Sequence, residues 1–274
     1  MAIGSATSLV LVLVCGAVAG SVLVVSCTGS TSEQPGAGRT PDPPAAASDV
    51  PEPDPCTIRV AGAEVTQTEA EAIEITDLAA RSVRATKPSA PSVAGLAARL
   101  ASVDPVAADN ATATARALLG HDGPALTCAY PRAGSADADP AKNGLTPRAT
   151  QLLSDMNAAF GAPPTGGYAS GGVESGHVND SSHYEGRAID VFFRPRTERA
   201  QNRRGWAAAQ WLVARGSQLS VLSVIYRDRI WTVWASSAGW RNYVHPSGNT
   251  KNPILRHLDH VHTAVVGGDF RRDD

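Results

Sequence analysis

One segment sets the expectation for both the fold and the site: Ser181-Ser182-His183-Tyr184-Glu185-Gly186-Arg187-Ala188-Ile189-Asp190. His183 falls in a predicted loop, whereas Asp190 falls on an apolar strand that is predicted over residues 188–193. Gly186 allows a tight turn before this strand and leaves the space between the two side chains clear. Imidazole and carboxylate groups are common ligands of zinc. The segment therefore points to a metal site.

A second motif, Asp259-His260-Val261-His262, follows near the C-terminus. On a strand, His260 and His262 point to the same face, so one can bind a metal while the other faces a substrate pocket. His183, Asp190 and His262 form the N, O, N donor set of a hydrolytic zinc site, which keeps a fourth position open. Structural zinc sites are instead rich in cysteine. We expect one catalytic zinc ion bound by these three residues.

The elements around the two motifs indicate an α+β domain on an antiparallel sheet. Thr146 and Pro147 predict the start of a helix, and Gly161 predicts its end. Adjacent strands with helices at the side are typical of this fold class. The other predicted elements are a helix over 203–215, a hairpin over 221–226 and 230–234, and a last strand over 259–266. The domain is assigned to residues 141–270.

Residues 56–140 predict a small, mostly helical module and a connector. A strand or hairpin is expected over 57–65, and Thr68 can cap the helix that follows. Cys56 and Cys128 are the only cysteines beyond the N-terminal segment, and such a pair in an oxidising compartment predicts a disulfide. A zinc site at these cysteines is disfavoured, because neither has a second Cys or His at ligand spacing.

The N-terminus of the 274-residue chain predicts export. Residues 1–27 contain an apolar run that suits a signal or membrane-anchor segment, although no Lys or Arg precedes it. Val24-Val25-Ser26-Cys27 is similar to a bacterial lipoprotein box, in which Cys27 takes the lipid. An uncleaved anchor, with Cys27 an ordinary thiol, is the alternative. Residues 28–55, rich in Pro, Ala and Ser, predict a disordered linker.

The charge balance excludes one class of partner. Lys and Arg number 24 against 26 Asp and Glu, so the net charge is −2. There is no electrostatic argument for binding nucleic acid.

The two motifs form the pattern Ser181-x-His183-x-x-Gly186-x-Ala188-x-Asp190, then His260-x-His262. This pattern resembles the signature of the lysostaphin/D-Ala-D-Ala metallopeptidase/hedgehog superfamily, over roughly residues 145–266. It is most similar to the D-alanyl-D-alanine carboxypeptidase and peptidoglycan endopeptidase branch, as found in secreted actinobacterial wall proteins. The resemblance implies a hedgehog/DD-peptidase-like antiparallel sheet with flanking helices. It also implies zinc ligation by His183, Asp190 and His262, and a peptidoglycan stem peptide as substrate.

The same resemblance implies roles for residues beside the ligands. Ser181 supports the first motif, and Tyr168 and Arg187 belong to the substrate or outer-ligand region. The base that accepts the proton of water is His260, oriented by Asp259, or else Asp259 itself. The expected envelope location suits a wall substrate.

One position departs from the pattern of the relatives. They commonly carry an arginine after a Gly-Tyr pair, but here Ala169 follows Tyr168. The loss of this cation would weaken transition-state stabilisation, unless another arginine replaces it (Arg187, Arg241 or Arg256). Two alternatives therefore stay open: a catalytically weak or inactive zinc-containing module that binds peptidoglycan or a protein, and a hydrolase that acts on another peptide or amide.

Other histidines and tryptophans carry weaker expectations. His177 and His245 fall in polar loops and are expected to be solvated, while His257 can line the cleft or lie on the surface. The tryptophans are expected in the core or pocket wall, in preference to a sugar-stacking platform: Trp231, Trp234 and Trp240.

Overall fold

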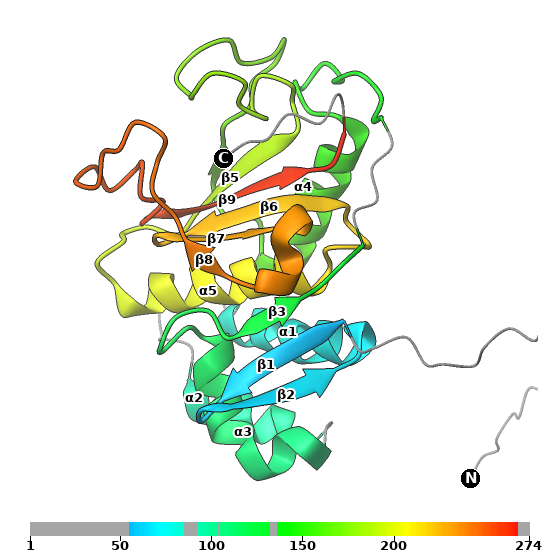
Figure 1. The fold of residues 1–274 in the computed structure, drawn as a ribbon, viewed down its shortest axis with the longest axis vertical. Coiled ribbons are helices and arrows are strands. Elements are labelled where there is room, and N and C mark those ends of the chain that lie inside the picture. The colour runs from blue at the N-terminus through cyan, green and yellow to red at the C-terminus, as the bar shows by residue number, and fades with distance from the viewer. Residues whose placement is uncertain (1–54, 85–91, 103–104, 132–135, 268–274) are drawn as a thin grey trace, which may run out of the picture. The chain divides into compact units, whose positions relative to one another are not determined.

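A six-stranded antiparallel sheet is the centre of the computed structural model of this protein (Figure 1). Its strand order is β4-β5-β9-β6-β7-β8. The last strand of the chain therefore lies between β5 and β6, which brings the two histidine motifs side by side. The strands are β4 (Thr165–Gly166), β5 (Ala188–Phe192), β6 (Val221–Tyr226), β7 (Arg229–Thr232), β8 (Arg241–Asn242) and β9 (His260–Val265).

The structure describes residues 55–84, 92–102, 105–131 and 136–267. The predicted export segment with Cys27, the linker up to residue 54, and residues 268–270 of the predicted C-terminal domain lie outside the described residues. None of the helices in the described part is both long and apolar enough to cross a membrane.

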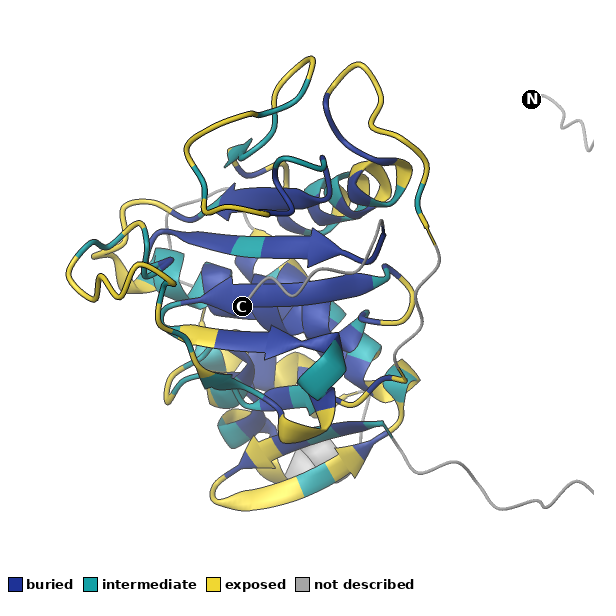
Figure 2. Cartoon of the chain, turned by 45° about the horizontal axis from the view of Figure 1, so that its top comes forward, coloured by how far each residue is buried: buried dark blue, intermediate teal, exposed yellow. Residues whose placement is uncertain are grey.

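Helices α4 (Pro147–Phe160) and α5 (Arg199–Ala214) pack on one face of the large sheet (Figure 2). The predicted ends of α4 are confirmed: the Thr146 side chain accepts a hydrogen bond from the Ala149 N–H, and Gly161 ends the helix with φ of 77°. The strand predictions are close, but β7 ends at Thr232 because the chain turns into a 3-10 helix, η1 (Val233–Ala238). The coarse prediction of an α+β fold with an antiparallel sheet and flanking helices is confirmed.

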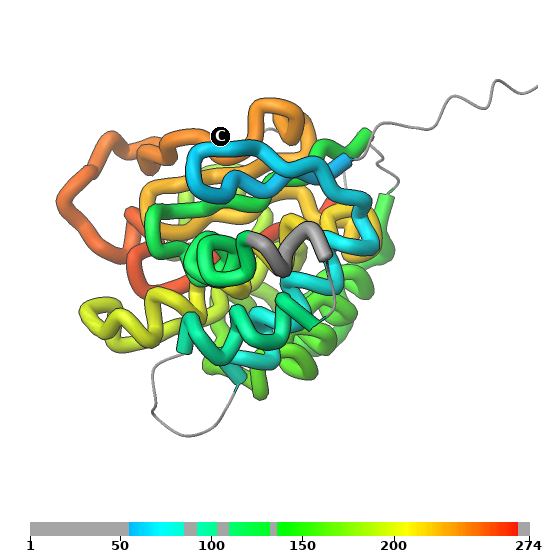
Figure 3. Tube along the Cα trace, turned by 90° about the horizontal axis from the view of Figure 1, so that it is seen from below, coloured from blue at the N-terminus to red at the C-terminus, as the bar shows by residue number. Residues whose placement is uncertain are grey.

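The N-terminal part combines three helices with a small sheet of order β2-β1-β3. Cys56 pairs with Cys128 across β1 and β3, and the two form the predicted disulfide. The predicted hairpin is also present, and Figure 3 shows it (blue) beside the helices. The elements are β1 (Cys56–Val60), β2 (Ala63–Gln67), α1 (Glu69–Arg84), α2 (Val93–Leu100), α3 (Pro105–Leu118) and β3 (Leu126–Cys128).

Helix α5 joins this part to the large sheet, because it packs on α1 and β3 as well as on β6. Residues 205–214 of α5 are all buried, as expected for a helix enclosed on several sides. Gln210 is fully buried, and its Oε1 accepts hydrogen bonds from the N–H groups of Ala125 (2.9 Å) and Leu126 (2.8 Å). Its Nε2 donates to the carbonyl of Leu118 at 2.8 Å. One amide thus connects α5 with β3 and the end of α3.

We predict that Gln210→Leu lowers the free energy of unfolding by about 3 kcal/mol, because buried backbone groups lose their partners without gaining water. Urea unfolding of the two proteins measures the difference. Gln151→Leu is the matched control, since Gln151 is exposed and its side chain bonds Asp155 on the surface of α4. A loss below about 1 kcal/mol in Gln210→Leu would contradict the role assigned to this amide.

Candidate metal centre

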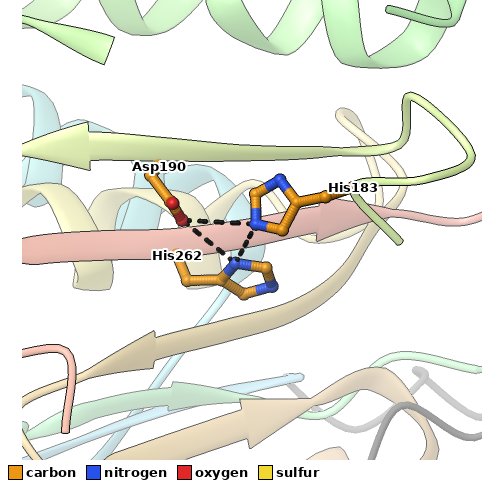
Figure 4. A group of neighbouring side chains, drawn as sticks. All are labelled: His183, Asp190 and His262. Atoms are coloured by element: carbon orange, nitrogen blue, oxygen red, sulfur yellow. Dashed lines mark hydrogen bonds and ion pairs between the residues drawn. The ribbon is translucent and has the colours of Figure 1, made fainter. Parts of the chain in front are cut away.

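Strand register brings Asp190 and His262 together. They are direct partners across β5 and β9 and therefore project from the same face of the sheet, opposite to the face covered by α4 and α5. Asp190 Oδ1 lies 3.2 Å from His262 Nδ1. His183 reaches the pair from the loop before β5, with Nε2 at 3.1 Å from His262 Nδ1 and 3.5 Å from Asp190 Oδ1 (Figure 4).

The three donor atoms fit a metal ion. In tetrahedral coordination with donors about 2.0–2.1 Å from zinc, neighbouring donors lie about 3.3–3.4 Å apart. The observed separations of 3.1, 3.2 and 3.5 Å bracket this value. Hydrogen bonds alone fit less well, because one N–H on His262 Nδ1 would have to serve both His183 and Asp190. These three residues form a possible metal-binding triad.

The protonation states also suit a cation. Burial opposes the ionisation of Asp190, but hydrogen bonds with His183 and His262 outweigh it and hold the pKa of the carboxyl well below its usual range. Burial lowers the pKa of His262, which favours the neutral imidazole that can donate a lone pair. The triad thus offers one carboxylate, at Asp190, and one neutral ring, at His262.

Gly167 orients His183. The His183 Nδ1–H donates to the carbonyl of Gly167 at 2.7 Å, so Nε2 is left with its lone pair facing the triad. Gly167 has φ of +79°, and a Cβ there would lie 2.2 Å from His183 Cε1. Only glycine leaves room for this ring. Ser181 is buried beside it, and its Oγ accepts a hydrogen bond from the His183 N–H at 3.4 Å.

His260 lies next to the triad on the same face of β9. Its Nδ1 is 2.8 Å from Asp259 Oδ1, and its Nε2 is 3.8 Å from Asp190 Oδ1. Asp259 Oδ2 accepts a second hydrogen bond from Arg194 Nε at 2.7 Å. The hydrogen bond with His260 is the main cause that lowers the pKa of Asp259 to about 2, and Arg194 adds to it. An ionised Asp259 therefore holds His260 with Nε2 toward the triad.

A cavity of about 650 Å³ opens over the triad. His177 and His245 line it without joining the triad, and the His177 ring stacks on His183 with centroids 3.9 Å apart. Burial lowers the pKa of His177 to about 4. His257 is buried in the cavity wall, 4.7 Å from the ring of His260. Sequence patterns did not indicate His177 or Arg194, because only the folded loops bring them to the site.

Other predicted residues lie elsewhere. Tyr168 does not line the cavity, and its hydroxyl is 2.9 Å from Thr165 Oγ1. Arg187 is buried, with its guanidinium on the Glu185 carboxylate and the Val265 carbonyl. The tryptophans with predicted core or wall roles lie outside the cavity lining, and Trp231 is fully buried in the core.

Arg241 and Arg256, which were considered as substitutes for an arginine after Tyr168, also have partners outside the cavity. Arg241 donates to Thr232 Oγ1, and Arg256 pairs with both oxygens of Asp228. Among the residues that the structure describes, the cavity is lined by no Lys or Arg.

Comparison with known proteins gives a match to a family model. The model of the family described as VldE, C-terminal domain, matches residues 141–254 of this chain, which is less than half of its length. The matched region contains His183 and Asp190 but ends before β9 and its two histidines. No curated protein and no solved structure matches the chain.

We predict that Gly167→Ala weakens the binding of Zn²⁺ or Co²⁺ about 10- to 100-fold, because the new Cβ displaces the ring of His183. Isothermal titration calorimetry measures the affinity. Gly171→Ala is the matched control, since Gly171 has a similar φ of +83° with nothing within 4 Å of the added Cβ. Equal affinity in the two variants would contradict the role of Gly167.

Proposed function

We propose that this chain is a zinc-dependent peptidase of the cell envelope that cleaves the peptide stems of peptidoglycan. The observation that supports it best is the donor triangle of His183, Asp190 and His262 at the base of a cavity, with His260 beside it. A metal site that faces a ligand-sized cavity is typical of catalytic centres.

Zinc is the proposed ion because two imidazoles and one carboxylate are the donor set of many hydrolytic zinc sites. When bound, zinc supplies Lewis acidity, which polarises a carbonyl and makes water acidic enough to attack near neutral pH. The three ligands would leave one coordination position toward the cavity. This open position distinguishes the proposed site from a structural zinc site.

His260 is the proposed general base. Its Nδ1–H is directed to the ionised Asp259, so its Nε2 carries the lone pair that accepts a proton from water. Asp259 would hold this tautomer and stabilise the imidazolium that forms. Arg194 would hold Asp259 in place through its 2.7 Å hydrogen bond. The alternative base, Asp259, is less favoured because both of its oxygens are already engaged.

The substrate class and the finer fold come from the sequence signature. The motif around His183 and Asp190 and the late His260-x-His262 resemble the lysostaphin/D-Ala-D-Ala metallopeptidase/hedgehog superfamily. We therefore propose a hedgehog/DD-peptidase-like domain, acting as a D,D-carboxypeptidase or an endopeptidase. The predicted export segment, lipidation of Cys27 or an uncleaved anchor, and a linker would place this domain at the wall.

A binding module without turnover is the second candidate. Ala169 stands where relatives carry an arginine, and Arg187, Arg241 and Arg256 are engaged away from the cavity. Such a protein would bind zinc and peptidoglycan or a partner protein, but would cut no bond.

Digestion of purified muropeptides with the zinc-loaded full-length chain, followed by mass spectrometry, tests the proposal. Release of D-alanine would identify a carboxypeptidase, and cleavage within the stem or cross-bridge would identify an endopeptidase. Binding without a mass change, at normal zinc content, would support the binding module instead. A native protein without bound metal would contradict both candidates.

We predict that His260→Ala lowers kcat at least about 100-fold, because the proton acceptor is lost, while zinc content stays near that of the unmodified chain. His183→Ala should lose both zinc and activity, because a ligand is removed. His121→Ala is the control, since His121 is exposed and bonds Arg116 away from the cavity. Retained activity in His260→Ala would assign the base to another residue.

A further inference from the structure

His177 lies beside the triad without belonging to it. Its ring stacks on the ring of His183, with centroids 3.9 Å apart and planes inclined by 22°. Imidazole rings are small, so a ring stacked on His183 lies close to the Nε2 atom that faces Asp190 and His262. His177 also lines the cavity. A substrate held at the triad would therefore come within reach of the His177 ring.

Tyr184 holds His177 in this position. Its hydroxyl accepts a hydrogen bond from the His177 N–H at 2.9 Å and donates one to the His177 carbonyl at 2.8 Å. The phenol ring also packs edge-on against the His177 ring, with centroids 5.8 Å apart. Tyr184 itself does not line the cavity. One side chain outside the cavity thus fixes the backbone of His177, although His177 follows Gly176, a residue type with wide conformational freedom.

The ring nitrogens of His177 are not used inside the protein: within the described ranges, neither of them hydrogen-bonds to another residue. Other histidines of the cavity differ, because Nδ1 of His183, His245 and His260 each has a partner. A neutral imidazole carries one N–H in either tautomer. A ring that is held in place while its N–H is free of protein partners is suited to bind a group that arrives with the substrate.

The proposed reaction creates a charge that such a donor would stabilise. When water adds to the scissile carbonyl carbon and one of its protons passes to His260, an electron pair moves onto the carbonyl oxygen, which becomes negative. When the C–N bond breaks, the pair returns and the leaving nitrogen takes the proton from His260. A hydrogen-bond donor aimed at this oxygen lowers the barrier. No Lys or Arg among the described residues lines the cavity to fill that role.

We infer that the His177 ring donates a hydrogen bond to this oxygen, and that Tyr184 positions His177 for it. The inference rests on the proposed peptidase function and adds a donor to its site. Support of the His183 ring by stacking is the competing role for His177. That role predicts a loss of zinc affinity, whereas the donor role predicts a loss of affinity for the transition state at unchanged zinc content.

A phosphinate analogue of N-acylated D-alanyl-D-alanine, in which tetrahedral phosphorus replaces the scissile carbonyl, probes the donor directly. We expect His177→Ala to weaken its binding to the zinc-loaded full-length chain about 100-fold, and His177→Gln, which keeps an N–H donor, to recover most of this loss. Tyr184→Phe should weaken binding about tenfold, since only the hydroxyl that holds His177 is removed. Tyr130→Phe is the matched control, because its hydroxyl also donates to a backbone carbonyl at 2.8 Å but lies away from the cavity.

Isothermal titration calorimetry measures the phosphinate and zinc affinities of each variant. Unchanged phosphinate affinity in His177→Ala, or a fall in zinc affinity that His177→Gln does not recover, would overturn the inference. Muropeptide digestion by the same proteins separates the inference from the peptidase proposal. Cleavage in which His177→Ala lowers kcat by a similar factor, with KM little changed, supports both.

The remaining outcomes divide the two proposals. Cleavage with an unchanged kcat in His177→Ala supports the peptidase and overturns the donor role. Phosphinate binding that weakens in His177→Ala, with no muropeptide cut, supports the donor role and contradicts the peptidase. A chain that neither binds the phosphinate nor cuts a muropeptide overturns both.

Discussion

The pairing of β5 with β9 is the constraint on which the rest of the site depends. In this register Asp190 faces His262, and both point away from α4 and α5. A shift of one residue would turn either side chain into the core, because neighbouring residues on a strand point to opposite faces. The apolar residues that follow Asp190 and precede His262 on their strands, Val191 and Val261, are fully buried. Burial of the helix-covered face thus fixes the register, and the register in turn fixes two residues of the triad.

The third residue of the triad is positioned differently. His183 comes from a loop, where no ladder of hydrogen bonds sets its position. A carbonyl at Gly167 and a hydroxyl at Ser181 hold it instead. His260 is held in a comparable way by Asp259, which is itself held by Arg194. Strand pairing positions Asp190 and His262, whereas side-chain and backbone hydrogen bonds position His183 and His260.

Sequence patterns were sufficient where local chemistry decides the structure. The ends of α4 followed from Thr146, Pro147 and Gly161, and the disulfide followed from a count of cysteines. The triad residues were predicted from their spacing and donor types, and they do lie together. Arg194 and the stacked His177 were not predicted, since loops bring them to the site and no periodicity encodes the path of a loop. Gln210 lies on a helix and was missed for another reason: its partners are more than eighty residues away in sequence.

The position of β9 has a consequence for the order of assembly. This strand is the last in the chain but lies in the middle of the sheet, between β5 and β6. While the polypeptide is being synthesised, β5 and β6 have no common neighbour until residues 260–265 have emerged. The long-range pairing that completes the sheet also delivers His262. Completion of the sheet and completion of the triad are therefore one event, so a nascent or truncated chain has no assembled triad before its sheet is closed.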